Sequence, residues 1–486
     1  MRKTLIIFIS IWLINDFSLE GQSNQQQPNE LWNVLASKYE FFRYNKISDR
    51  RFKHEEVMMR LEQLEDSFRV NTVGQSVEGK PIKLVSWGTG PTQILMWSQM
   101  HGNEPTATMA LMDVFNWLES DTSNHDLISK LQEKLTVHFI PMLNPDGADR
   151  FTRRNAQHID INRDALRQQT PEGRILKQVR DSLEADWGFN LHDQGRTTAA
   201  GDKPATLSFL APAFDEDRNV NEKREDAMQL IAALNVQLQQ MIPGQVGRYW
   251  DEFEPRAFGD NIQKWGTRTI LIESGGQYRD RDKQQIRKLN FLSIISSLVW
   301  IADQSFEQFT VQDYFSIMDN SRGIRDVIIK NVQLPVDQGG FLTDIGIDFN
   351  EIESLDYRDY YLQANVTDLG DLSTSNGYIE YDMKNYEVRS SLKYDSAFET
   401  NEDLLQRGQL GLLKQGYTHV IVESPNYFVG ELYLQVNEKV VEPVKMGANP
   451  GLLFYRGGQL KYALVNGYLI DINLSEQNII SGKRDL

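Results

Sequence analysis

The sequence predicts an α/β fold with a mixed, mostly parallel sheet flanked by helices, followed by a C-terminal β-rich region. Short apolar runs such as 135–140 alternate with helical patterns such as 171–183, and this alternation is typical of a parallel sheet covered by helices. After about residue 305, helical periodicity is scarce and short β-branched runs follow one another. A chain of 486 residues also exceeds what one hydrophobic core normally supports. We therefore expect a first domain over residues 28–305 and an accessory β-rich region of unknown role over residues 306–486.

Apolar residues at steps of three and four predict the helices. The first is expected from Asn29, since Leu31, Trp32, Leu35 and Tyr39 follow this spacing. The other expected helices cover residues 54–66, 104–118, 171–183, 222–241 and 285–301. Short apolar runs predict strands at residues 93–97, 135–140, 189–191 and 269–272, with two more around the turn at residues 77–80. Strands of the β-rich region are expected at residues 327–329, 417–422 and 432–436.

The N-terminus carries the pattern of an export signal. Arg2 and Lys3 precede an apolar run over residues 5–14, and polar sequence follows. A positive segment followed by about ten apolar residues is typical of a secretory signal peptide and is too short to span a bilayer comfortably. We expect a signal peptide over residues 1–22, a secreted or periplasmic location, and no stable membrane insertion after cleavage. The alternative is an uncleaved membrane anchor.

The charge and the absence of cysteine restrict the partners and the metal ligands. The formal net charge is −17. Such a surface repels the phosphate backbone, so we expect no nucleic-acid partner. The chain has no cysteine, so disulfides and thiolate ligands are both excluded. Any zinc ion must therefore be held by histidine and carboxylate side chains.

Two of the seven histidines stand at the ends of expected strands. His101 and Glu104 follow the strand at 93–97, and His192 follows the strand at 189–191. Functional side chains of open α/β sheets gather at the carboxyl ends of strands. Two histidines and one glutamate form a known catalytic zinc ligand set that leaves one position open for water. His-x-x-Glu alone is a weak signal, because a surface histidine before a helix N-terminus gives the same pattern.

Three further segments surround this pattern. The first is the turn sequence Asn-Pro-Asp-Gly at residues 144–147. The second is Arg-Arg-Asn-Ala-Gln-His-Ile-Asp-Ile-Asn-Arg-Asp at residues 153–164, and the third places Glu273 at the end of an apolar strand. In this order and at these spacings, the segments resemble the zinc carboxypeptidase A family over roughly residues 75–300.

The resemblance implies a role for each matching residue. It makes His101, Glu104 and His192 the ligands of one zinc ion per chain. Glu273 matches the general base that deprotonates the zinc-activated water. The remaining matches are Arg153 at the oxyanion, Asn162 and Arg163 on the terminal carboxylate of the substrate, and Asp160 bonded to the first ligand histidine.

Three assignments within the resemblance stay open. Arg154 adjoins Arg153, although the spacing to the carboxylate-binding pair favours Arg153. Tyr249 is the nearest candidate for the family's substrate-capping tyrosine, and an aromatic residue packed beside Trp250 is the alternative. Asp260 could lie in the specificity pocket and favour a basic C-terminal residue. A solvated loop carboxylate is the interpretation that we prefer for it.

The function implied by the resemblance is that of a metallocarboxypeptidase, which hydrolyses the C-terminal bond of a peptide or protein with a free C-terminal carboxylate. One alternative is a zinc amidase or deacylase on the same fold, including a hydrolase of cell-wall peptides. Another is a non-catalytic peptide-binding protein. Asn162 and Arg163 favour a substrate with a free carboxylate, and a complete ligand set together with Glu273 counts against the non-catalytic alternative.

Overall fold

The computed structural model of the chain describes residues 19–120, 125–335, 340–428, 432–440 and 444–474. The signal peptide expected at residues 1–22 falls mostly on residues 1–18, which lie outside the described residues, and it stays a prediction. Helix α1 (Leu19–Phe42) is the first described element. Within the described ranges, no helix combines the length and the apolar character that crossing a membrane requires.

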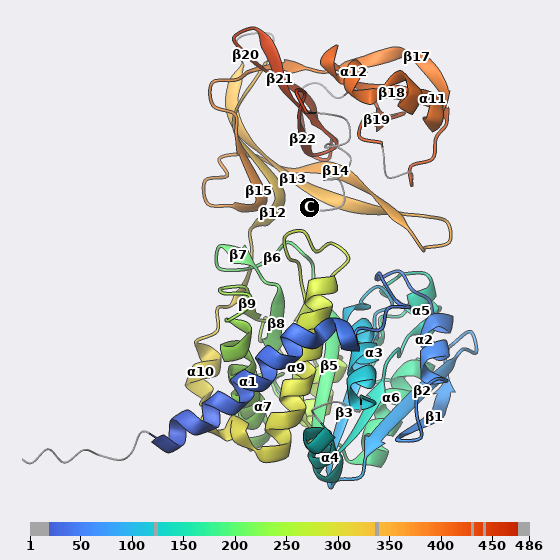
Figure 1. Cartoon of the computed structure of the whole chain (residues 1–486), viewed down its shortest axis with the longest axis vertical. Coiled ribbons are helices and arrows are strands. Elements are labelled where there is room, and N and C mark those ends of the chain that lie inside the picture. Colours follow the sequence, from blue (N-terminus) through green and yellow to red (C-terminus); the bar gives the residue numbers. More distant parts are fainter. Residues whose placement is uncertain (1–18, 121–124, 336–339, 429–431, 441–443, 475–486) are drawn as a thin grey trace, which may run out of the picture.

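The first domain is built on one large mixed sheet (Figure 1). Its strand order is β1-β2-β4-β3-β5-β10-β8-β9, and the four central strands β4, β3, β5 and β10 are parallel to one another. The pairs β1–β2, β2–β4 and β10–β8 are antiparallel. The strands are β1 (Phe68–Gln75), β2 (Pro81–Gly88), β3 (Thr92–Ser98), β4 (Leu135–Ile140), β5 (Trp187–Asp193), β8 (Leu207–Leu210), β9 (Val246–Arg248) and β10 (Arg268–Ser274). The expected fold class is confirmed.

Helices cover both faces of this sheet and enclose two apolar cores. On one face, α1, α3, α4, α7 and α9 share a core with the strands, and on the other face α6 and α8 close a second core. The helices are α2 (His54–Leu61), α3 (Thr106–Leu118), α4 (His125–Lys134), α5 (Pro145–Asp149), α6 (Pro171–Leu183), α7 (Glu222–Leu238), α8 (Phe258–Lys264) and α9 (Gln284–Asp303). This burial on both faces explains why β4 is mostly apolar: all six of its residues are buried, including the polar Thr136 and His138.

Most of the expected elements form within a few residues of their expected bounds. Helix α6 and strand β4 have the bounds that their patterns predict. The helix expected from Glu104 begins instead at Thr106, because Pro105 occupies the N-cap position. Glu104 therefore lies in the turn before α3, where its side chain can point back towards His101. The helix expected over 54–66 ends at Leu61, and the helices α4 and α8 were not predicted.

The change to sheets comes later in the chain than residue 305. The short helices η2 (Ser305–Gln308) and α10 (Val311–Phe315) pack on α7, and β11 (Asn320–Arg322) pairs with β6 (Thr198–Ala200) in a small sheet with β7 (Lys203–Pro204). The first strand of the β region proper is β12 (Ile324–Leu334). Residues 305–322 thus pack with the first domain, because Phe306, Tyr314 and Ile317 are buried in its core.

The β region contains three small sheets (Figure 1). The first is β14-β13-β12-β15, the second β16-β20-β21-β22 and the third β17-β18-β19. The strands are β13 (Phe341–Glu353), β14 (Tyr360–Gly370), β15 (Asn376–Asp382), β16 (Glu387–Ser390), β17 (Leu392–Thr400), β18 (Tyr417–Ser424), β19 (Gln435–Val436), β20 (Gly451–Arg456), β21 (Gln459–Val465) and β22 (Tyr468–Asp471). Two helices that the sequence did not predict, α11 (Asn401–Arg407) and α12 (Gln409–Lys414), cover β17 and β18.

Candidate metal centre and substrate cavity

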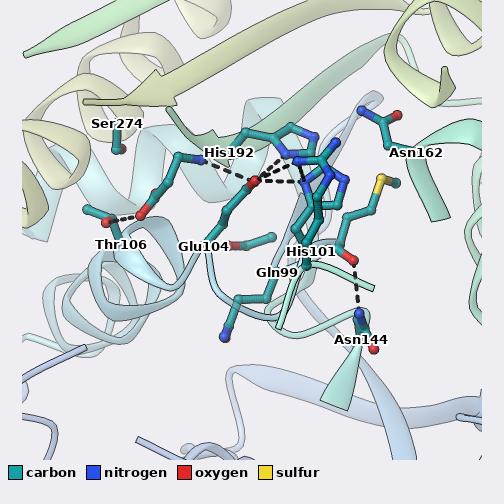
Figure 2. Close-up of polar contacts among 12 residues, drawn as sticks. Gln99, His101, Glu104, Thr106, Asn144, Asn162, His192 and Ser274 are labelled. Atoms are coloured by element: carbon teal, nitrogen blue, oxygen red, sulfur yellow. Dashed lines mark hydrogen bonds and ion pairs between the residues drawn. The ribbon is translucent and has the colours of Figure 1, made fainter. Parts of the chain in front are cut away.

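His101, Glu104 and His192 meet at the carboxyl ends of two neighbouring parallel strands (Figure 2). His101 and Glu104 lie in the turn after β3, and His192 lies near the end of β5, which pairs with β3 up to Ser98. The Nδ1 atom of His101 is 2.8 Å from one oxygen of Glu104, and the Nδ1 atom of His192 is 2.6 Å from the other oxygen. All three side chains are buried, and one ligand atom from each lies within 4.8 Å of the others. The structure therefore brings together the three residues that the sequence selected.

A glycine allows this turn to form. A Cβ atom on Gly102 would lie 1.9 Å from the carbonyl carbon of Gly147, in the Asn-Pro-Asp-Gly turn. That distance is far below any real carbon–carbon contact, so only glycine fits where the two backbones touch. The side chain of Asn144 fastens the same contact, because its amide donates to the carbonyl of Met100 at 3.2 Å. The two sequence motifs are therefore packed against each other.

The arrangement of donors and acceptors fits a cation. The Nε2 atom of His101 is 3.0 Å from an oxygen of Asp160. A proton on Nε2 serves this bond, so the lone pair of Nδ1 faces Glu104. Two imidazole nitrogens and a carboxylate thus converge, and this nitrogen and oxygen set suits Zn²⁺.

Asp160 also holds Arg153 beside the triad. The Nε atom of Arg153 donates to the second oxygen of Asp160 at 3.0 Å, and its Nη1 atom is 3.3 Å from Glu104. Burial opposes ionisation of Asp160, but the hydrogen bond and charge of His101, with Arg153, hold its pKa below the usual range. Arg154 points elsewhere, since its guanidinium donates to the carbonyl of His158. Of the two adjacent arginines, the structure therefore places Arg153 at the triad.

A cavity of about 690 Å³ opens on the triad and is lined by Arg153, Asn162, Arg163, Tyr249 and Glu273. Asn162 accepts a hydrogen bond from the backbone amide of Phe258 at 2.9 Å, and this bond ties the short helix η1 (Ile161–Arg163) to α8. All the residues that the sequence proposed for the substrate and the reaction thus face one space.

Glu273 stands next to His192 in the sheet, because the two residues are paired in the β10–β5 register. Its carboxylate is buried, and among the described residues its Oε2 atom has no hydrogen-bond partner. Burial, together with the charges of Glu104 and Asp193, raises the pKa of Glu273 well above its ordinary value. A buried carboxylate with a free oxygen, close to a candidate metal centre, is suited to proton transfer.

Tyr249 fits both alternatives that the sequence left open. It lines the cavity, and its ring packs edge-to-face on Trp250 with the ring centroids 5.0 Å apart. The preferred interpretation of Asp260 as a solvated loop residue is wrong. Asp260 lies on α8, is buried, lines the cavity and accepts a hydrogen bond from the backbone of Glu254 at 3.1 Å. Burial raises the pKa of Asp260 to about 7.

Two contacts of the site were not found from the sequence. The Nε atom of Arg163 lies 3.3 Å from a carboxylate oxygen of Glu254 on the cavity wall. Lys283 reaches the carboxylate of Asp193, directly after the ligand His192, at 3.0 Å. Neither Glu254 nor Lys283 belongs to a motif, so no local pattern marks them. The sequence offered one signal for these contacts, namely that Asp193 directly follows His192.

A family of known proteins matches the part of the chain that forms the triad. The family model described as zinc carboxypeptidase matches residues 54–205, a stretch that contains the triad, Arg153, Asp160, Asn162 and Arg163 but ends before Glu273. Carboxypeptidase SOL1 of Arabidopsis thaliana is 30% identical over 102 residues, which cover 20% of this chain and 21% of that protein. Carboxypeptidase E of Caenorhabditis elegans is 30% identical over 164 residues, covering 29% of this chain and 35% of that protein.

The matches to whole proteins are partial. The chain spans between about a fifth and two fifths of the length of the first curated relatives that it matches. Among solved structures, a metallo-carboxypeptidase from Burkholderia cenocepacia aligns with a TM-score of 0.43 and 15% identity, covering 52% of this chain and 70% of that chain.

Proposed function

Since this chain belongs to the zinc carboxypeptidase family, we propose that it is a zinc-dependent metallocarboxypeptidase that hydrolyses the C-terminal peptide bond of peptides. The observation that carries the proposal is the placement of a carboxylate, Glu273, and a guanidinium, Arg153, on the cavity beside the His-Glu-His triad, with a second guanidinium, Arg163, on the same cavity. This is the set of groups that cleavage of an amide at a free chain end requires.

Zinc, one ion per chain, is the proposed cofactor, held by His101, Glu104 and His192. When bound, it would supply a Lewis acid that polarises the scissile carbonyl and lowers the pKa of water towards neutrality. The contribution of Asp160 is to orient His101, because its oxygen lies 3.0 Å from Nε2 and fixes the tautomer that presents Nδ1 to the metal.

Glu273 and Arg153 act on the reacting atoms. Glu273 takes a proton from the attacking water at its unpartnered Oε2 atom and passes it to the leaving amine. Arg153 lies on the cavity beside Glu104 and donates to the carbonyl oxygen as negative charge grows on it. Asp160 holds the Arg153 guanidinium at 3.0 Å, so little reorganisation is needed when that charge develops.

Asn162 and Arg163 make the enzyme an exopeptidase. Both residues line the cavity, and the guanidinium of Arg163 can bind a terminal carboxylate through paired hydrogen bonds. Glu254 already occupies one edge of that guanidinium, so the substrate carboxylate takes the remaining donors. Tyr249 lines the same cavity, and its proposed role is to cover the bound chain end.

Export is a second part of the proposal. It depends on the pattern of residues 1–22 alone, and the substrates that we propose are peptides that such a protein would meet outside the cytoplasm.

The proposal is tested by assaying zinc-loaded protein on peptides with varied C-terminal residues, each as the free acid and as the amide, alongside cell-wall peptides. Release of the terminal residue from the free acids supports the proposal. Cleavage of acetylated or cell-wall substrates alone would favour the amidase alternative. Binding of the peptides without turnover would favour the non-catalytic alternative.

A further inference from the structure

A second cavity, of about 340 Å³, adjoins the first at the junction with the β region. Glu104 and Asp193 line both cavities, so the two cavities share a wall at the metal centre. The far wall of the second cavity comes from the β region, through Glu351 and Glu353 of β13. In Figure 1, β13 and β14 extend across the top of the first domain. The β region is therefore part of the surroundings of the active site.

The position of this cavity relates it to the path of a peptide. Arg163, the proposed partner of the terminal carboxylate, lines only the first cavity. In a bound peptide, the scissile bond would lie at the triad and the C-terminal residue beside Arg163. The peptide residues before the scissile bond would therefore extend away from Arg163. The second cavity is the hollow that adjoins the triad through Glu104 and Asp193.

The charged groups that line the second cavity are of both signs. The cationic side chains are Arg50, Arg196, Arg281 and Lys283, and the carboxylates are Glu104, Asp193, Asp280, Glu351 and Glu353. Arg50, Arg51 and Arg281 all contact one carboxylate, that of Glu351: Arg51 at 2.8 Å, Arg281 at 3.6 Å and Arg50 through its Nη2 atom. The guanidinium groups of Arg50, Arg51 and Arg281 also stack over aromatic rings, namely Phe151, Tyr360 and Phe349. The carboxylate of Glu351 is thus the shared partner of three buried guanidinium groups.

Two arginines of the cavity wall keep hydrogen-bond donors unused. Arg281 is only 7% exposed, and within the described part of the chain its Nε and Nη2 atoms have no hydrogen-bond partner. Arg196 contacts Asp326 through Nη1, and its Nη2 atom has no hydrogen-bond partner among the same residues. Burial and the nearby charge of Arg281 lower the pKa of Arg196 to about 10, so it stays charged at neutral pH. Buried donors without acceptors are costly, and an anionic acceptor would satisfy them.

Each carboxylate of the same wall has a partner within the protein, although the Oδ1 atom of Asp193 has none among the described residues. Asp193 pairs with Lys283 at 3.0 Å, and Asp280 accepts the backbone amide of Ile286 at the start of α9 at 2.9 Å. Glu353 lies 3.4 Å from Arg51. Within the described residues, this wall therefore has more unpartnered donor atoms, on Arg281 and Arg196, than unpartnered carboxylate oxygens, of which Oδ1 of Asp193 is one.

We propose that the second cavity is a subsite for the peptide on the N-terminal side of the scissile bond, and that Arg281 and Arg196 select an acidic side chain there. The inference rests on the proposed carboxypeptidase function. It gives the β region a role, because Glu351 of β13 contacts Arg281 and Asp326 of β12 contacts Arg196.

The test compares peptides that share one C-terminal residue and carry Glu, Ala or Lys at each of the three positions before it. The kcat/KM of a Glu peptide should exceed that of the Ala peptide by about tenfold or more at one position, since charge-assisted hydrogen bonds contribute this much. Arg281→Gln should bring the Glu-to-Ala ratio towards one, and Arg281→Lys should restore part of it. Arg196→Gln repeats the test should the Arg281 variants not fold.

Arg358→Gln is the matched control, because Arg358 joins the β region to α2 through Glu55 and Glu56 and does not line the cavity. It should leave the Glu-to-Ala ratio unchanged. A ratio of one in the wild type, a preference for Lys, or an equal loss in Arg358→Gln would overturn the inference.

A binding measurement distinguishes failure of this inference from failure of the proposed function. Calorimetry of the zinc-loaded Glu273→Gln variant measures the Kd of the same peptides without turnover. If the wild type cleaves none of the peptides but the Glu peptide binds about tenfold more tightly than the Ala peptide, the subsite stands and the proposed activity fails. Equal Kd values for the Glu and Ala peptides refute the subsite even where all the peptides are cleaved.

Discussion

The exopeptidase character depends on Arg163, and its replacement by alanine tests this directly. Arg163 lies on η1, is 38% exposed, and donates from Nη1 to the carbonyl of Asn162 at 2.7 Å. A charge-assisted bond to the substrate carboxylate contributes ~1.5–3 kcal/mol, which is about ten- to a hundredfold in kcat/KM. The competing pair with Glu254 is partly exposed, so it offsets only ~0.2–1 kcal/mol. We therefore expect a loss of at least about tenfold on a free-acid peptide.

The assay measures kcat/KM for one peptide as the free acid and as its C-terminal amide. The wild type should cleave the acid far better, and Arg163→Ala should narrow this gap by lowering the rate on the acid alone. Glu254→Gln should change the acid-to-amide ratio of kcat/KM in the opposite direction. It frees the guanidinium, so the acid-to-amide ratio should rise by up to about fivefold.

Equal losses on acid and amide in Arg163→Ala would indicate a fold defect rather than a lost contact. If the wild type itself does not distinguish acid from amide, the reasoning is refuted, and an endopeptidase or deacylase becomes the better hypothesis.

Three further predictions concern the metal, the base and the pH dependence of stability. The protein should bind about one zinc per chain by elemental analysis, and His101→Ala or His192→Ala should lose it at modest chelator strength; undiminished zinc in both variants would contradict the assignment. Glu273→Gln should lower turnover at least ~100-fold with its zinc retained, and near-normal turnover would place the base elsewhere. Asp260 has a pKa raised from 3.8 to about 7 in the folded protein, so its ionisation disfavours folding and stability falls as pH rises from about 4 to about 7. Asp260→Asn removes this ionisation penalty, which is up to about 4 kcal/mol in the free energy of unfolding. The gain in Tm should therefore be clear at pH 8 and small at pH 4. An equal gain at both pH values would contradict a destabilising ionisation of Asp260.

The sequence alone determined the α/β architecture of the first domain and the metal triad. Strand β4 and helix α6 were predicted with their observed bounds, because mostly apolar runs and three-to-four spacing directly reflect which faces become buried. His101 and His192 were assigned because the ordered motifs around them resemble the zinc carboxypeptidase A family. Their position after two strands agrees with this assignment, since the carboxyl ends of neighbouring parallel strands lie side by side. Such signals are local, and local patterns are what a sequence displays.

Only the tertiary structure decided the surroundings of that triad. Asp260 is buried rather than solvated because α8, the helix that carries it, packs against β10 and η1. The pairs Arg163–Glu254 and Arg51–Glu351 join residues 91 and 300 positions apart. Contacts at such separations depend on how whole elements pack, and a lone charged residue in a loop looks the same in sequence whether it meets a partner or water. The physical reason is that burial periodicity is written along the chain, whereas the pairing of charges is set only when distant segments are brought together.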